Sequence, residues 1–115
     1  MKAAGSCTWA RISWAGFEPN KDWPEEEGRP DPAQVKVCRV WIRLFGEPMG
    51  KIRQDRTSYA LKHAVEAWAD LEGGPIYIAN GAFIAAALAE GYRAERTSEG
   101  SPNAYFNMRL KKAHP

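Results

Sequence analysis

Two residues near the middle of the chain have a spacing that suits acid–base or metal chemistry. His63 and Glu66 are three apart in a segment expected to be helical, so their side chains share one face. A carboxylate placed there can orient an imidazole as a general base, or both groups can hold a metal ion. The only other histidine is His114, and no Cys/His cluster has zinc spacing. We therefore expect a surface pair, with no metal site, no cofactor and no catalytic residue.

The two cysteines, Cys7 and Cys38, indicate neither a disulfide framework nor a catalytic thiol. A nucleophilic thiol needs a positioned base, and no local pattern supplies one beside Cys7. Residues 73–75 lack the spaced glycines and the Lys-Ser/Thr ending of a phosphate loop. We therefore expect no enzymatic activity. Because no apolar signal segment follows Met1, we also expect a cytoplasmic protein whose thiols are free and buried.

Basic side chains fall in two blocks that can attract phosphate. Residues 35–56 contain six basic and two acidic side chains, and residues 91–115 contain five and two, although the net charge of the chain is only +2. The helix expected over residues 81–90 has few side chains that can contact base edges. Contacts to the phosphate backbone of the nucleic acid should therefore dominate. The alternative is a purely structural one, in which these basic side chains lie on the solvent-exposed faces of strands. The predicted nucleic-acid-binding residues are Lys51, Arg53, Arg56, Arg93, Arg96, Arg109 and Lys111.

Aromatic and arginine side chains favour a protein partner. Five tryptophans in 115 residues are more than one small core usually absorbs, and exposed Trp and Arg dominate interface energies. On a strand over residues 35–45, Trp41 would lie between two arginines on one face. The alternative is that most of the tryptophans belong to the core. The predicted protein-binding residues are Trp9, Trp23, Arg39, Trp41 and Arg43.

The elements that position these residues begin with strands. Residues 6–14 and 35–45 predict two strands from their β-branched and aromatic content. A proline-rich loop over residues 16–34 connects them. A turn at residues 46–50 and a short return strand at residues 51–53 follow.

The second half of the chain predicts two helices and a hairpin. Residues 58–72 have helical apolar spacing, with Thr57 or Ser58 as N-cap and two glycines after the last turn. After a link at residues 76–79, Asn80 is the expected N-cap of a helix over residues 81–90. Gly91 suits the left-handed position that ends this helix. The hairpin strands are residues 92–97 and 104–110.

This order predicts one small α+β domain, residues 1–115, with two helices and an antiparallel sheet. Residues 57–110, a helix–link–helix–hairpin unit, have the outline of a winged helix. The most apolar stretch, residues 76–88, is too short and interrupted to span a membrane. We therefore expect no membrane association, and nothing in the sequence indicates an oligomeric state.

Three runs of sequence resemble small uncharacterised accessory proteins encoded by phages, prophages and plasmids. The runs are SYALKHAVEAW, YIANGAFIAAALAEGYRAER and SPNAYFNM, within residues 57–108. The resemblance implies a protein of a mobile element and carries no known activity. Such proteins tend to act by binding, so we predict a non-enzymatic protein that engages a protein partner, for example an anti-CRISPR-type inhibitor of a host defence system. The alternative is a winged-helix-like nucleic-acid-binding protein or transcriptional regulator.

Overall fold

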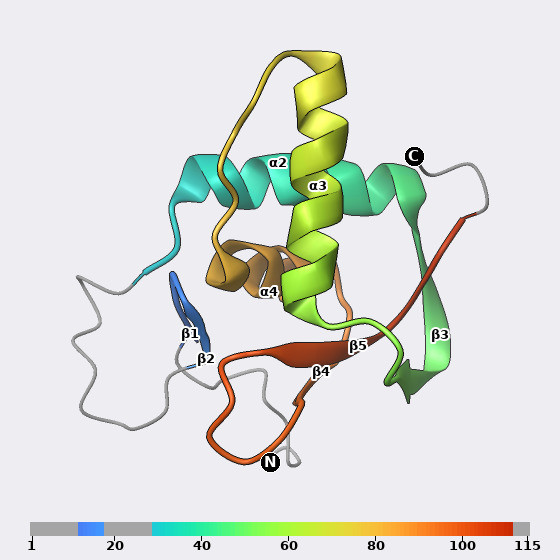
Figure 1. Ribbon diagram of the computed structural model, residues 1–115. Coiled ribbons are helices and arrows are strands. Elements are labelled where there is room, and N and C mark those ends of the chain that lie inside the picture. The colour runs from blue at the N-terminus through green and yellow to red at the C-terminus, as the bar shows by residue number, and fades with distance from the viewer. Residues whose placement is uncertain (1–11, 18–28, 112–115) are drawn as a thin grey trace.

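The computed structural model describes residues 12–17 and 29–111, whose elements follow one another as in Figure 1. The first described residues form a hairpin of two short strands, β1 (Ile12–Ser13) and β2 (Gly16–Phe17). The later elements are α2 (Pro32–Phe45), β3 (Gly46–Arg53), α3 (Ser58–Glu72), α4 (Asn80–Ala89), β4 (Ala94–Arg96) and β5 (Ala104–Leu110). The α+β class is confirmed, with three helices in these ranges where two were predicted.

The predicted strand over residues 35–45 is wrong, because this segment belongs to helix α2. Asp31 is the N-cap: its carboxylate accepts a hydrogen bond from the Ala33 N–H at 2.9 Å, and Pro32 occupies the first turn. The Asp-Pro pair is a helix-start signal in the sequence, and it outweighs the β-branched content that follows. Three side chains of α2 are buried at helical spacing, namely Cys38, Trp41 and Ile42.

The predicted loop over residues 16–34 also needs correction. Its first two residues form β2 and its last three belong to α2, while residues 18–28 lie outside the described part. Of the strand predicted over residues 6–14, the described part contains only β1 and the turn after it. The strand therefore ends at Ser13, one residue before the predicted end, whereas residues 6–11 of the prediction lie outside the described part.

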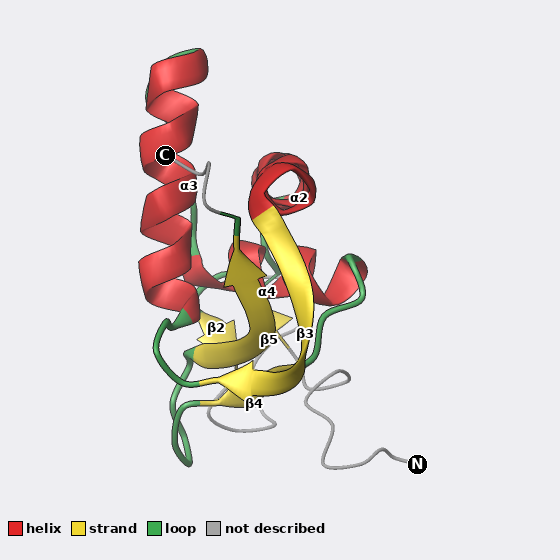
Figure 2. Cartoon of the chain, turned by 90° about the vertical axis from the view of Figure 1, so that its right-hand side faces the viewer, coloured by secondary structure: helices red, strands yellow, loops and turns green. Residues whose placement is uncertain are grey.

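One antiparallel sheet has the strand order β3-β5-β4, so β5 lies between the other two (Figure 2). The hairpin of β4 and β5 is confirmed, with β4 shorter than predicted. The turn predicted at residues 46–50 is instead part of β3. Pro48 is tolerated there because β3 is an edge strand, and the register with β5 shifts between Pro48 and Arg53.

Strand β3 joins the predicted helix–link–helix–hairpin unit through the sheet. Helix α2 and strand β3 precede α3 and α4, and β3 pairs with β5, which gives helix–strand–helix–helix–strand–strand with the first strand beside the last. In residues 12–17 and 29–111, no helix is long and apolar enough to cross a membrane.

Helix α4 forms the centre of the core. Seven of its ten residues are buried, and it packs against α2, α3 and the β1–β2 hairpin (Figure 1). The Phe83 ring lies 6.0 Å from Trp41 of α2 and 5.5 Å from Phe106 of β5, measured between ring centroids. Trp41 is only 1% exposed, so it belongs to this aromatic core and not to the predicted surface.

The start of α4 is held by residues far away in the sequence. Asn80 is not the N-cap but the first helical residue, and the N-cap, Ala79, has no side chain that can cap. Instead, the Ala79 N–H donates to Gln34 Oε1 at 2.9 Å, and the Gly81 N–H donates to the Trp14 carbonyl at 2.8 Å. Tertiary contacts thus satisfy amides that a capping residue normally satisfies.

Candidate functional site

A pocket of about 560 Å³ lies between four segments: α3, the link that leads into the start of α4, the β1–β2 turn and the β4–β5 loop. Three exposed aromatic side chains line it: Trp14, Tyr59 and Tyr77 are 49%, 53% and 60% exposed. Because four separate segments form this pocket, sequence patterns did not predict it. Its remaining lining residues are Ala15, Lys62, His63, Glu66, Asn80, Pro102 and Asn103.

Lys62 is the buried cation of this pocket and is only 4% exposed. Its Nζ lies 5.1 Å from the centroid of the Tyr59 ring and 5.0 Å from that of Tyr77. In the described part of the chain, its single oxygen partner is Glu66 Oε2, 3.5 Å away. An ammonium has three donors, and burial makes an unmade hydrogen bond costly. Lys62 is therefore ready to donate to an acceptor on a ligand.

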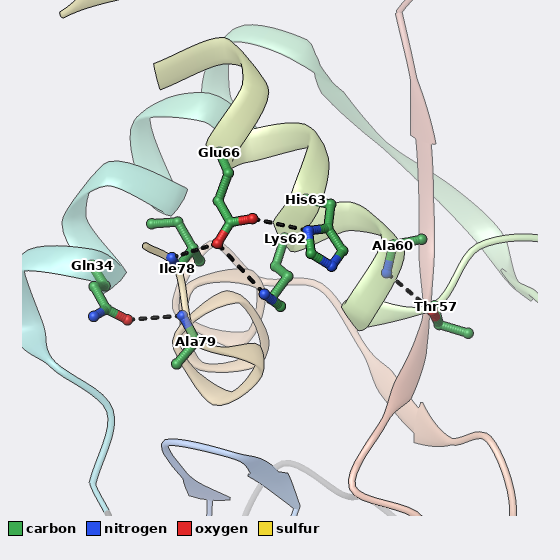
Figure 3. Close-up of polar contacts among 8 residues, drawn as sticks. All are labelled: Gln34, Thr57, Ala60, Lys62, His63, Glu66, Ile78 and Ala79. Carbon is green, nitrogen blue, oxygen red and sulfur yellow. Dashed lines mark hydrogen bonds and ion pairs between the residues drawn. The ribbon is translucent and has the colours of Figure 1, made fainter. Parts of the chain in front are cut away.

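Glu66 organises the polar side of the pocket (Figure 3). Its Oε1 lies 2.9 Å from His63 Nδ1, and its Oε2 accepts from the Ile78 N–H at 2.8 Å. Burial raises the pKa of the Glu66 carboxyl, but the Ile78 N–H, Lys62 and His63 together lower it by more, so the net pKa lies below its ordinary value. The predicted contact between His63 and Glu66 is confirmed, and it favours the tautomer with the proton on Nδ1 when His63 is neutral.

Hydrogen bonds donated by the Asn80 side chain close the pocket at the β1–β2 turn. Asn80 Nδ2 lies 2.9 Å from the Ala15 carbonyl, 3.2 Å from the Pro102 carbonyl and 3.0 Å from Asn103 Oδ1. Its own Oδ1 is buried and has no partner among the described residues. One amide side chain thus ties α4 to two loops, which fixes the rim of the pocket.

Gly81 lets the β1–β2 turn approach α4. A Cβ at this position would lie 1.7 Å from the Ser13 carbonyl oxygen, which is backbone and cannot rotate away. Only glycine therefore allows the close packing that places Trp14 beside the pocket.

A smaller hollow of about 80 Å³ lies where β3 and β5 meet the start of α3. Three arginines from the predicted nucleic-acid-binding set line it. Arg53 pairs with Asp55 at 2.5 Å, and Arg109 pairs with Glu47 at 2.8 Å, whereas Arg56 has no ion pair in the described ranges. We call this hollow, with Arg53, Arg56 and Arg109, the arginine hollow.

The other predicted basic residues do not line the arginine hollow. Arg93 Nη2 donates to the Gly50 carbonyl at 2.8 Å. The Arg96 guanidinium lies 5.0 Å from the centroid of the Phe17 ring, so it packs against the β1–β2 hairpin. Lys51 and Lys111 are exposed at two further positions on the surface. The predicted set therefore divides between one cluster and several separate sites.

The predicted protein-binding surface does not form as expected. Trp9 and Trp23 lie outside the described residues. On helix α2, Arg39 and Arg43 are one turn apart, and both donate to Glu90, with Nε–oxygen distances of 2.7 and 2.9 Å. Trp41 faces the core instead, because a helix places residues two apart on different faces.

Cys38 is fully buried and free, as predicted, whereas Cys7 lies outside the described part. Burial, and to a smaller extent the charge of Glu66, raises the pKa of the Cys38 thiol to about 12. This thiol is therefore protonated and unreactive at neutral pH. The described residues contain no group of three or more His, Cys, Asp or Glu side chains that could hold a metal ion.

Comparison of the chain with protein families, with curated proteins and with solved structures gives no significant match. Its function must therefore be argued from the chemistry of its own surface.

Proposed function

We propose that this chain is a non-enzymatic, winged-helix-like nucleic-acid-binding protein whose main contact surface is the arginine hollow, where β3 and β5 meet the start of α3. The observation that carries the proposal is the convergence of Arg53, Arg56 and Arg109 on one hollow. Such binding is compatible with a protein of a mobile element, which the sequence resemblance implies, and with the predicted alternative of a transcriptional regulator.

The arginine hollow is suited to a phosphate group. Guanidinium groups bind phosphate oxygens with two parallel hydrogen bonds, and the volume of about 80 Å³ is too small for a larger ligand. Two of the arginines already have carboxylate partners, but Arg56 has none in the described part of the chain. The first turn of α3 adds the positive end of its helix dipole.

The burial of α4 determines which parts of the nucleic acid the protein could contact. In a helix-turn-helix arrangement the second helix enters the major groove, but seven of the ten α4 residues are buried. Side chains that contact base edges are therefore not available from α4. We infer that contacts to the phosphate backbone dominate, so binding depends weakly on sequence and strongly on salt.

Fluorescence anisotropy with labelled DNA tests this proposal. We expect binding to random-sequence DNA at low salt that weakens steeply as salt is added. The triple variant Arg53→Gln, Arg56→Gln, Arg109→Gln should reduce both the affinity and the salt slope. The matched control replaces three exposed basic residues elsewhere, Arg29, Lys36 and Arg43, and should change affinity much less. Absence of binding at low salt, or equal losses in the two triple variants, would overturn the proposal.

A second candidate, a protein partner, is supported by the outer face of α2. Val40 and Leu44 are 42% and 50% exposed and lie one turn apart, next to Arg43. An apolar pair flanked by arginine is a common interface pattern and fits a partner with apolar and acidic side chains. Inhibition of a host defence protein is one form of this function. A pull-down that retains a partner with the wild type but loses it with Val40→Ser, Leu44→Ser would support this candidate.

A further inference from the structure

The geometry points to the aromatic pocket around Lys62 as a site for one unpaired nucleobase of a single-stranded nucleic acid. This inference rests on the proposed nucleic-acid binding and specifies what the second hollow of the molecule binds. The larger pocket and the arginine hollow are neighbours on α3, because Leu61 lines the arginine hollow and the next residue, Lys62, lines the pocket. Successive residues of a helix point about 100° apart, so a strand with a phosphate in the arginine hollow would reach the pocket by crossing the first turns of α3.

The rings around the pocket indicate a flat ligand. Trp14, Tyr59 and Tyr77 are three of the six large hydrophobic side chains that are exposed in the described part of the chain, and all three line this pocket. Bases stack on exposed aromatic rings in proteins that bind single strands, whereas a paired base in a duplex offers only its edges. A volume of about 560 Å³ is within the usual range for small-ligand sites.

The charges of the pocket favour a neutral polar group over a phosphate or a carboxylate. Lys62 and Glu66 offset each other, and no other lining residue carries a permanent charge. The Lys62 ammonium has three N–H donors and, among residues 12–17 and 29–111, one oxygen partner, so donors remain for a ligand. The carbonyl and ring-nitrogen acceptors on a base edge meet this need without adding a buried negative charge.

Strands with and without bases separate this inference from the proposed function. The probes are a labelled single-stranded oligonucleotide, an oligonucleotide of equal length whose central sugars lack bases, and a duplex, all followed by anisotropy. We expect the wild type to bind the base-bearing strand at least about tenfold more tightly than the abasic strand, since one stacked base contributes about this factor. Both single strands carry the same phosphates, so the difference measures the base.

Variants then locate the base. Tyr77→Leu and Tyr59→Leu should abolish the preference for the base-bearing strand and leave duplex affinity unchanged. Lys62→Met should reduce the preference, with urea unfolding as a check that it folds. Tyr105→Leu makes the same change on β5 outside both hollows and should have no effect.

Two outcomes would overturn the inference for different reasons. If the wild type binds duplex and both single strands equally, or if the tyrosine variants keep the preference, the pocket does not hold a base although nucleic-acid binding stands. If the wild type binds none of the three probes at low salt, the proposed function fails as well.

Discussion

Helices α3 and α4 are neighbours in the chain and occupy opposite environments. Seven of the ten residues in α4 are buried, against four of the fifteen in α3. After Asn80 and Gly81, the buried residues of α4 are alanine, phenylalanine and isoleucine. The first two turns of α3 instead expose Tyr59 and His63 and place the buried Lys62 at the pocket.

This difference bears on which helix would carry the proposed binding. In the helix-turn-helix arrangement that we propose, α4 would have the place of the recognition helix. Here the β1–β2 hairpin packs on α4, and the Gly81 N–H donates to the carbonyl of Trp14 in the turn of that hairpin. The polar and aromatic residues that line the pocket lie instead on α3 and the loops beside it. We therefore expect substitutions around α4 to reduce folding stability and, under the proposed function, substitutions around α3 to reduce binding.

The largest effect is expected from Trp41→Ala, in the aromatic core against α4. Removal of a buried indole should lower the free energy of unfolding by about 3–5 kcal/mol. Urea unfolding followed by circular dichroism measures this loss. Trp41→Phe retains a ring and removes the indole N–H, which has no partner among the described residues, so it should cost much less. A Trp41→Ala protein with full stability would place this residue on a surface after all.

The next largest effect is expected from Gly81→Ala at the start of α4. The new Cβ would overlap the Ser13 carbonyl, so the β1–β2 turn must move away and lose its hydrogen bond to Gly81. We expect a loss of roughly 2–4 kcal/mol, although alanine normally stabilises a helix. Gly73→Ala, at the end of α3, is the matched control because a Cβ there meets nothing within 4 Å. Similar unfolding midpoints for the two variants would contradict the close packing on α4.

A smaller effect is expected on acidification, and it involves both helices. The pKa values of Glu66 on α3 and Glu90 at the end of α4 both lie below the ordinary value of 4.5. For Glu90 the main cause is its hydrogen bonds to Arg43 and Arg39. Because the unfolded chain takes up these protons first, the stabilisation is complete above about pH 4.5 and is lost as the pH falls through the lowered pKa values.

Urea midpoints measured from neutral pH down to about pH 3 test this sign. The wild type should lose stability over the acid part of the range, and Glu66→Gln and Glu90→Gln should each show a shallower loss. A variant with an acid profile as steep as that of the wild type would show that its carboxylate is not stabilised in the folded state.

The smallest effect concerns the Cys38 thiol, which measures how tightly α2 covers the core. In a Cys7→Ser protein, the remaining thiol should react with a thiol reagent only after unfolding, because burial raises its pKa to about 12. Reaction in urea is the positive control. Rapid reaction under native conditions would show that α2 opens readily. The region around α4 would then differ less from the exposed region around α3.

Local signals in the sequence determined α3 and the β4–β5 hairpin. Thr57 caps α3 by accepting from the Ala60 N–H at 3.2 Å (Figure 3), and Gly73 ends it. Gly91 has the positive φ of 94° that was expected after α4. Each of these devices acts within a few residues, so the pattern of the chain was sufficient. The Asp-Pro start of α2 was present as well, but the β-branched residues after it favoured the wrong element.

Tertiary structure alone decided the site. The pocket draws residues from four segments, and its rim is held by Asn80 and Gly81, whose partners are more than twenty residues away. A lysine on a helix is usually exposed, yet Lys62 is only 4% exposed, and its Nζ lies 5.1 and 5.0 Å from the ring centroids of Tyr59 and Tyr77. The convergence of Arg53, Arg56 and Arg109 likewise depends on the pairing of β3 with β5. Contacts between distant segments depend on how the elements pack. A single sequence lists the residues but does not indicate which distant ones contact each other.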